Sequence, residues 1–279
     1  MKRDNNDKSR LLNYLLILML LACARGEALG APDRQALQEM STMATMATVN
    51  LLLYYNLNGI PYETENLESF NQNLNRLREL SGQADDASLS EQVRRLDDAV
   101  ADLKHLPQSV ADSRSVWPAY ARWLPGLIEA HVHLEKSLSE RYDAAPEVAQ
   151  AQSGLHVLSH NIGRMLLSYQ MASFPNFGGD IWILDEQALT ALDTDIEQRF
   201  SELAERDGGI AQALNAPLRD YRFVRRRLLE PAGNWAPNAV SLYLAKTMRT
   251  LDGEARRGEA RRGAWQAARL DNMCHLPVG

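Results

Sequence analysis

Residues 51–54 read Leu-Leu-Leu-Tyr, and residues 166–169, about 115 positions further along, read Leu-Leu-Ser-Tyr. A turn that contains a proline follows each copy, with Pro61 after the first and Pro175 after the second. Similar segments that recur in one order at a nearly fixed distance are typical of duplicated structural units. We therefore expect the body of this chain to contain one unit twice.

The correspondence continues beyond these turns. An amphipathic segment comes next in each copy, Leu67–Leu74 in the first and Leu189–Ile196 in the second. A tryptophan close to a proline then recurs, as Trp117-Pro118 and as Trp235-Ala236-Pro237. The order is kept and the spacing changes by only a few residues, as loop insertions between helices would produce.

The repeated unit is expected to be helical. Apolar side chains recur every three or four residues over most of the chain from 32 to 252, and no alternating strand pattern is sustained. Ser88 with Glu91, and Asp185, are candidate helix caps, while Pro118 and Pro125 predict a late start or a kink in the fourth helix. The expected helices cover about 33–58, 63–80, 88–106, 113–142, 146–173, 185–207, 210–229 and 237–251.

Eight amphipathic helices predict an all-α fold of two tandem four-helix, up-and-down units. The units are assigned to residues 32–145 and 146–252, and they could form two separate bundles or one elongated body. Residues 253–279 contain Gly-Glu-Ala-Arg-Arg twice in succession. Because glycines in a charged repeat weaken a helix, we expect this segment to be a flexible tail.

Residues 1–31 are interpreted as an export signal. A basic start precedes the apolar run Leu11–Ala22, which is too short to span a bilayer but suits a signal-peptide core. The sequence Leu20-Leu21-Ala22-Cys23 resembles the lipobox of bacterial lipoproteins, and the resemblance implies a diacylglycerol on Cys23. Cleavage after Cys23-Ala24 or near Gly30, or an uncleaved anchor, are the alternatives. Lipidation and cleavage both predict an exported, periplasmic protein, and lipidation would hold it at the membrane, whereas the uncleaved anchor is the alternative to export.

The charge of the chain bears on its partners, and its cysteine content bears on disulfide bonds. Residues 33–145 carry 10 basic and 17 acidic side chains, and residues 146–252 carry 10 and 13. An acidic body repels phosphate, so nucleic acid is not an expected partner. Cys274 is the one cysteine besides Cys23, so no network of internal disulfides is expected and burial must stabilise the fold.

His156 and His160 are four residues apart on one expected helix face, a spacing that can hold a metal ion. A third ligand would have to come from another helix, such as His131 or His133. His131 and Glu135 share a similar face and are expected to form a solvent-facing pair, or an acid–base pair if a cleft shifts both pKa values. The spacing alone favours a structural role for the four side chains of these two pairs, His156 with His160 and His131 with Glu135.

The aromatic side chains gather where the two copies have equivalent helix ends. They could pack in the core, or they could line a ligand pocket at the end of each unit. The pocket candidates are Tyr54, Trp117, Tyr169, Trp182 and Trp235. Met40, Met43 and Met46 recur every three residues and predict a soft core or interface face, with a copper-binding ladder as the alternative.

No catalytic template is present in the sequence. Asp193 with Asp195, and Asp97 with Asp98, are not helical neighbours and are expected to face solvent. We therefore expect a non-catalytic binding or scaffold protein of the cell envelope, without a cofactor, that engages a protein partner or senses a ligand. The alternative is a bundle that binds a small molecule or a metal between its helices.

Overall fold

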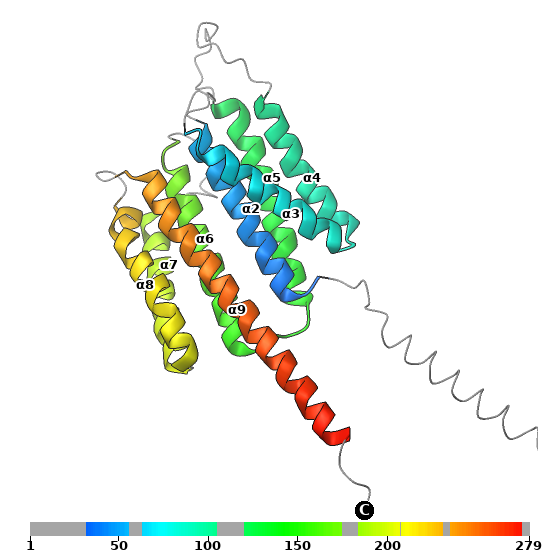
Figure 1. The fold of residues 1–279 in the computed structure, drawn as a ribbon. Coiled ribbons are helices and arrows are strands. Elements are labelled where there is room, and N and C mark those ends of the chain that lie inside the picture. The colour runs from blue at the N-terminus through cyan, green and yellow to red at the C-terminus, as the bar shows by residue number, and fades with distance from the viewer. Residues whose placement is uncertain are drawn as a thin grey trace, which may run out of the picture.

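The computed structural model describes residues 32–55, 63–104, 120–174, 184–206, 208–230 and 235–274. Over these residues the chain forms eight α-helices and no strand, so the all-α prediction is confirmed (Figure 1). The helices are α2 (Arg34–Tyr54), α3 (Asn66–Gln83), α4 (Ala87–Lys104), α5 (Tyr120–Ala144), α6 (Gln150–Met171), α7 (Glu186–Arg206), α8 (Gly208–Leu229) and α9 (Pro237–Cys274). The predicted repeat positions Pro61, Trp117, Pro118 and Pro175 lie outside the described residues.

Aspartates cap three of the helix starts. The Asp33 carboxylate accepts a hydrogen bond from the Ala36 amide at 2.7 Å, and Asp185 accepts one from Ala188 at 2.7 Å. These bonds satisfy amides that have no partner in the first turn of a helix. The prediction that Asp185 caps its helix is confirmed.

The cap of α4 differs from the predicted Ser88–Glu91 box. Helix α4 begins at Ala87, and Asp86 is the cap, because its carboxylate accepts from the Leu89 amide at 2.9 Å. The same carboxylate accepts two hydrogen bonds from Arg141 on α5, at 2.6 and 3.1 Å. The preceding Asp85 adopts φ of 46°, which allows the sharp turn from α3. Asp86 therefore joins α3, α4 and α5 at one end of the bundle.

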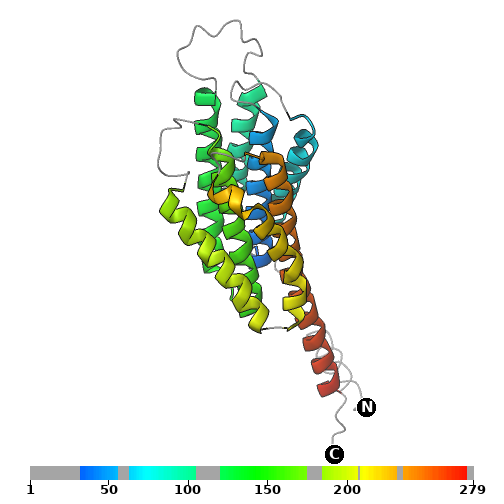
Figure 2. The same ribbon diagram turned by 90° about the vertical axis from the view of Figure 1, so that its left-hand side faces the viewer.

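Helices α2 and α6 lie at the centre and run in the same direction (Figures 1 and 2). Helix α2 packs against α3, α5, α6 and α9, while α6 packs against α2, α7 and α9. All eight helices contribute side chains to one continuous hydrophobic cluster. Such a cluster stabilises the fold by removing apolar surface from water.

The fourth predicted helix starts late. Helix α5 begins at Tyr120 and includes Pro125 within its second turn. Because only the first four amides of a helix lack a partner, Pro125 at the sixth position removes one intrahelical hydrogen bond, the one to the carbonyl of Ala121. The helix therefore begins beyond Pro118 but not beyond Pro125, so the interpretation that it starts after both prolines is wrong.

The predicted end of the last helix near Leu251 is wrong. Helix α9 continues to Cys274 and extends beyond the other helices (Figure 1). Ala255 is buried, Arg256 forms an ion pair with Glu39 at 2.9 Å, and Arg262 donates to Gln152. These contacts with α2 and α6 offset the cost of glycine in a helix, about 1 kcal/mol each relative to alanine.

Gly163 on α6 sits where three helices approach closely. A methyl group at this position would lie 3.0 Å from Met248 Cε on α9 and 3.4 Å from Thr45 Cγ2 on α2. Gly163→Val should therefore lower the free energy of unfolding by roughly 1–3 kcal/mol through overpacking, measured by urea denaturation. Gly82→Val is the matched control, since open space surrounds Gly82 on α3. Equal losses in both variants would contradict the close packing of α2, α6 and α9.

Candidate functional site

The aromatic pocket candidates are only partly brought together. The Tyr169 ring stacks on Trp235 with centroids 4.3 Å apart, and the Tyr169 hydroxyl accepts a hydrogen bond from the Ala236 amide at 2.8 Å. Tyr54 is half-buried and meets the ring of Tyr55 at 4.7 Å instead. Trp117, Trp182 and the lipidation candidate Cys23 lie outside the described residues. The methionines belong to the core, because Met40 and Met46 are buried and Met43 packs against the same cluster.

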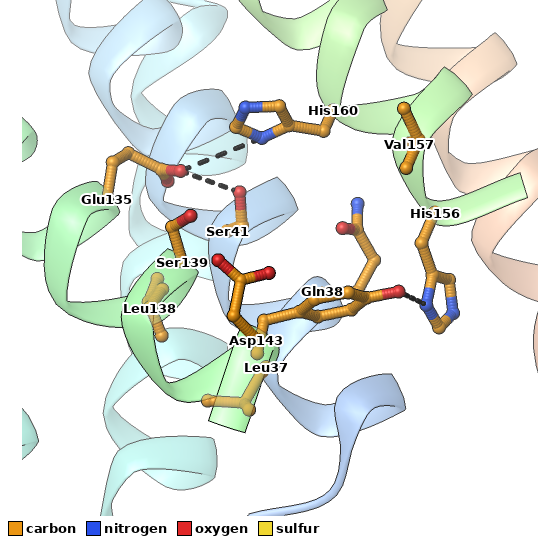
Figure 3. Close-up of a pocket in the computed structure, with 11 residues that line it drawn as sticks. Leu37, Gln38, Ser41, Glu135, Leu138, Ser139, Asp143, His156, Val157 and His160 are labelled. Carbon is orange, nitrogen blue, oxygen red and sulfur yellow. Dashed lines mark hydrogen bonds and ion pairs between the residues drawn. The ribbon is translucent and has the colours of Figure 1, made fainter. Parts of the chain in front are cut away.

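A cavity of about 170 Å³ lies between α2, α5 and α6 (Figure 3). Helices α5 and α6 each approach α2 and are joined by a short connection, and the side chains between them leave this space. Polar and apolar groups from all three helices converge there. Its lining comprises Leu37, Gln38, Ser41, Glu135, Leu138, Ser139, Tyr142, Asp143, His156, Val157 and His160.

Glu135 is the central acidic group of the cavity. Its Oε2 accepts a hydrogen bond from the Ser41 hydroxyl at 2.8 Å and lies 3.9 Å from His160 Nδ1. Its Oε1 is buried and has no hydrogen-bond partner among the described residues. Burial raises the pKa of the Glu135 carboxyl to about 7, because a charged carboxylate loses hydration there, and the Ser41 bond offsets only part of this effect. Glu135 can therefore gain or lose a proton near neutral pH.

His156 is held by two neighbours. Its Nδ1 lies 2.9 Å from the Tyr142 hydroxyl, and its Nε2 lies 3.0 Å from Gln35 Oε1. Because the amide oxygen can only accept, the ring carries its proton on Nε2, and Nδ1 accepts from Tyr142. Burial lowers the pKa of His156 to about 4, so the ring is neutral at pH 7. Both nitrogens are thus occupied, which leaves neither free as a metal ligand.

His160 is the more accessible member of the predicted metal pair. Its side chain is 40% exposed and faces Glu135, and burial, with a smaller effect of Arg164, lowers its pKa to about 4. Within the described part of the chain, no three His, Cys, Asp or Glu side chains gather closely enough to hold a metal ion. The third ligands suggested from sequence, His131 and His133, do not complete such a group.

The prediction that His131 and Glu135 face solvent is wrong. His131 is 3% exposed and its Nδ1 lies 3.2 Å from the Thr48 hydroxyl on α2. Burial and the charge of His160 lower the pKa of His131 to about 4, while the pKa of Glu135 moves upward. Spacing along one helix could not reveal this, because the covering residues come from α2 and α6.

A second buried acid lies next to the cavity. Thr42, the neighbour of Ser41, donates a hydrogen bond to Asp252 Oδ2 on α9 at 2.7 Å, and Gln38 donates to Thr42 at 3.4 Å. Burial raises the pKa of Asp252 to about 6. Adjacent hydroxyls of α2 therefore hold two buried carboxyl groups, one from α5 and one from α9. No sequence pattern marks Ser41, Thr42 or Asp252, since their positions depend on packing between distant helices.

Comparisons with protein families, with curated proteins and with solved structures returned no match for this chain. Among the described helices, none combines the length and the apolar character that crossing a bilayer requires.

Proposed function

We propose that this chain is an exported, non-catalytic binding protein of the cell envelope that holds a small ligand between α2, α5 and α6. The observation that carries this proposal is the cavity, in which polar groups from three helices surround one space and a buried oxygen of Glu135 has no partner. Binding sites in proteins are typically concave and largely apolar, with a few polar groups that orient the ligand. In helical bundles they commonly form between helices.

The proposal includes a duplication of residues 32–145 and 146–252. In the first segment α2 packs on α3 and α5, α3 on α4, and α4 on α5. In the second segment α6 packs on α7 and α9, α7 on α8, and α8 on α9. The same order of principal contacts supports two copies of one four-helix unit, joined through α2, α6 and α9, although α6 also contacts α8 without a comparable contact of α2 with α4 among the described residues.

Export and envelope attachment rest on residues 1–31. The basic start and the apolar run support a signal segment, and Cys23 supports attachment through a lipid. An envelope protein partner is part of the proposal, and two exposed apolar side chains on the consecutive helices α8 and α9 support it. Phe223 on α8 is 56% exposed and Leu242 on α9 is 64% exposed, which is unusual for large apolar residues.

Native mass spectrometry of the full chain extracted from membranes tests the proposal. We expect a diacyl addition on Cys23 and a bound small molecule that Ser139→Trp abolishes, because the larger side chain fills the cavity from an exposed position. Glu140→Trp is the matched control, one residue away on the same helix and outside the cavity lining. The ligand site would be refuted if the native mass spectrum of the wild-type protein, like that of Ser139→Trp, showed no bound small molecule.

A further inference from the structure

The side chains that line the cavity carry a negative charge, although Arg34 lies over the ring of the lining residue Tyr142. Two carboxyl groups, those of Glu135 and Asp143, line it, whereas its lining contains no lysine or arginine. Its two histidines are neutral at pH 7, since burial lowers the pKa of each to about 4. An anionic ligand would be repelled by this arrangement, and a cation would be attracted.

The hydrogen-bonding groups that point into the cavity are mainly acceptors. Figure 3 shows the carboxyl groups of Glu135 and Asp143 and the amide of Gln38 directed toward the same space. A ligand that supplies N–H groups would give these acceptors hydrogen bonds in place of those that they make to water.

The cavity walls also include an apolar part. Leu37, Leu138 and Val157, one from each of the three helices, contribute aliphatic surface. The volume of about 170 Å³ is close to the roughly 150 Å³ of an engineered protein cavity that accommodates benzene. A ligand with a short carbon body and one polar head fits these dimensions.

We propose that the cavity binds a small protonated amine, whose ammonium group is held by Glu135 and whose carbon body lies along Leu37, Leu138 and Val157. This inference rests on the proposed ligand-binding function and names the chemical class of the ligand. The ammonium group donates to the Glu135 carboxylate and compensates its negative charge, and Asp143 adds negative charge about two helix turns further along α5. A neutral ligand of the same size would leave that charge uncompensated.

Amine binding should depend on pH through Glu135. The groups that face this carboxyl are Ser41 on α2 and His160 on α6, and Asp252 of α9 is held by the neighbouring Thr42. His160 in turn interacts with His131 of α5 and with Arg164 of its own helix. Because the pKa of Glu135 is about 7 and an ammonium group favours the carboxylate, affinity should rise with pH. Between pH 6 and pH 8 we expect the affinity to increase about tenfold.

Isothermal titration calorimetry of the full chain tests the inference with n-butylamine, n-butanol and butyrate, which share one carbon body and differ in charge. At pH 8 n-butylamine should bind at least tenfold more tightly than n-butanol, and butyrate should bind most weakly. Glu135→Gln should weaken amine binding roughly tenfold to a hundredfold, as expected for the loss of a charge-assisted hydrogen bond. Asp143→Asn should weaken it by a smaller factor, since Asp143 is exposed.

Glu129→Gln is the control, because this glutamate lies on α5 with its side chain 75% exposed and should leave amine affinity unchanged. Equal or tighter binding of n-butanol or butyrate would overturn the amine inference while leaving a ligand site in place. Zinc ion as a fourth probe distinguishes a metal site, and zinc binding that displaces n-butylamine and is lost in Glu135→Gln would also overturn it. If no probe binds at millimolar concentration, the proposed ligand site falls with the inference.

Discussion

Replacing Asp193 by alanine should lower the free energy of unfolding by about 2–3 kcal/mol, since it leaves a buried hydroxyl without an acceptor and removes a partly exposed ion pair. Asp193 on α7 is 2% exposed and accepts two hydrogen bonds from Arg225 on α8, at 2.6 and 2.5 Å. It also accepts one from the hydroxyl of the fully buried Tyr221 at 2.8 Å. The substitution would leave the Tyr221 hydroxyl without an acceptor and the Arg225 guanidinium without its counterion. Urea denaturation followed by circular dichroism measures this loss.

A double-mutant cycle separates the buried hydroxyl from the ion pair. Tyr221→Phe removes the hydroxyl that Asp193→Ala leaves without an acceptor. The loss of stability in the double variant should therefore be smaller than the sum of the losses in the two single variants. Glu202→Ala on the same helix is the control, because Glu202 is 44% exposed and its ion pair with Arg206 should contribute less than about 1 kcal/mol. Similar losses for Asp193→Ala and Glu202→Ala would show that the α7–α8 contact does not depend on the buried network.

Asp193 also illustrates what the sequence could not show. The spacing of Asp193 and Asp195 suggested two solvent-facing carboxylates, and only Asp195 is half-exposed. The difference arises because α8 covers the Asp193 face with Arg225 and Tyr221, residues some thirty positions away. Helical periodicity, in contrast, depends on neighbours within one turn, so the positions of the helices and the Asp185 cap could be predicted.

In the candidate site, too, helical spacing could be predicted from the sequence and contacts between helices could not. Sequence spacing singled out His156, His160, His131 and Glu135 as pairs on helix faces, and all four are partly or fully buried near α2. The geometry that gives them a shared environment requires Ser41, which the sequence did not distinguish from other polar residues on a helix. The tail was predicted wrongly for a related reason. Its glycines are a local signal in the sequence, whereas the contacts of Arg256 and Arg262 with α2 and α6 depend on packing between distant helices.

Replacing Glu135 by glutamine should stabilise the protein at pH 8 by about 3 kcal/mol and have almost no effect below pH 4.5, because raising a pKa by one corresponds to about 1.4 kcal/mol. The folded protein holds this carboxyl with a pKa of about 7, above its ordinary value of 4.5. Between these pH values the folded state binds more protons than the unfolded state, so stability falls as pH rises. Glutamine keeps the oxygen that accepts a hydrogen bond from Ser41 but carries no charge. The variant therefore does not lose stability through this side chain as pH rises.

The difference between variant and wild type isolates Glu135 from the other titrating groups. The lowered pKa values of His131, His156 and His160 make stability rise with pH toward 6.5, and the raised pKa of Asp252 acts in the opposite direction. These contributions are present in both proteins and cancel to first order.

Urea denaturation at pH 4.5, 6 and 8 should therefore give a stability gain that grows with pH, while Glu129→Gln stays within about 0.5 kcal/mol of wild type. A gain that does not change with pH would mean that Glu135 is not held as a buried acid. A gain that n-butylamine reverses would show that the carboxylate is retained at a cost in stability because it binds the ligand.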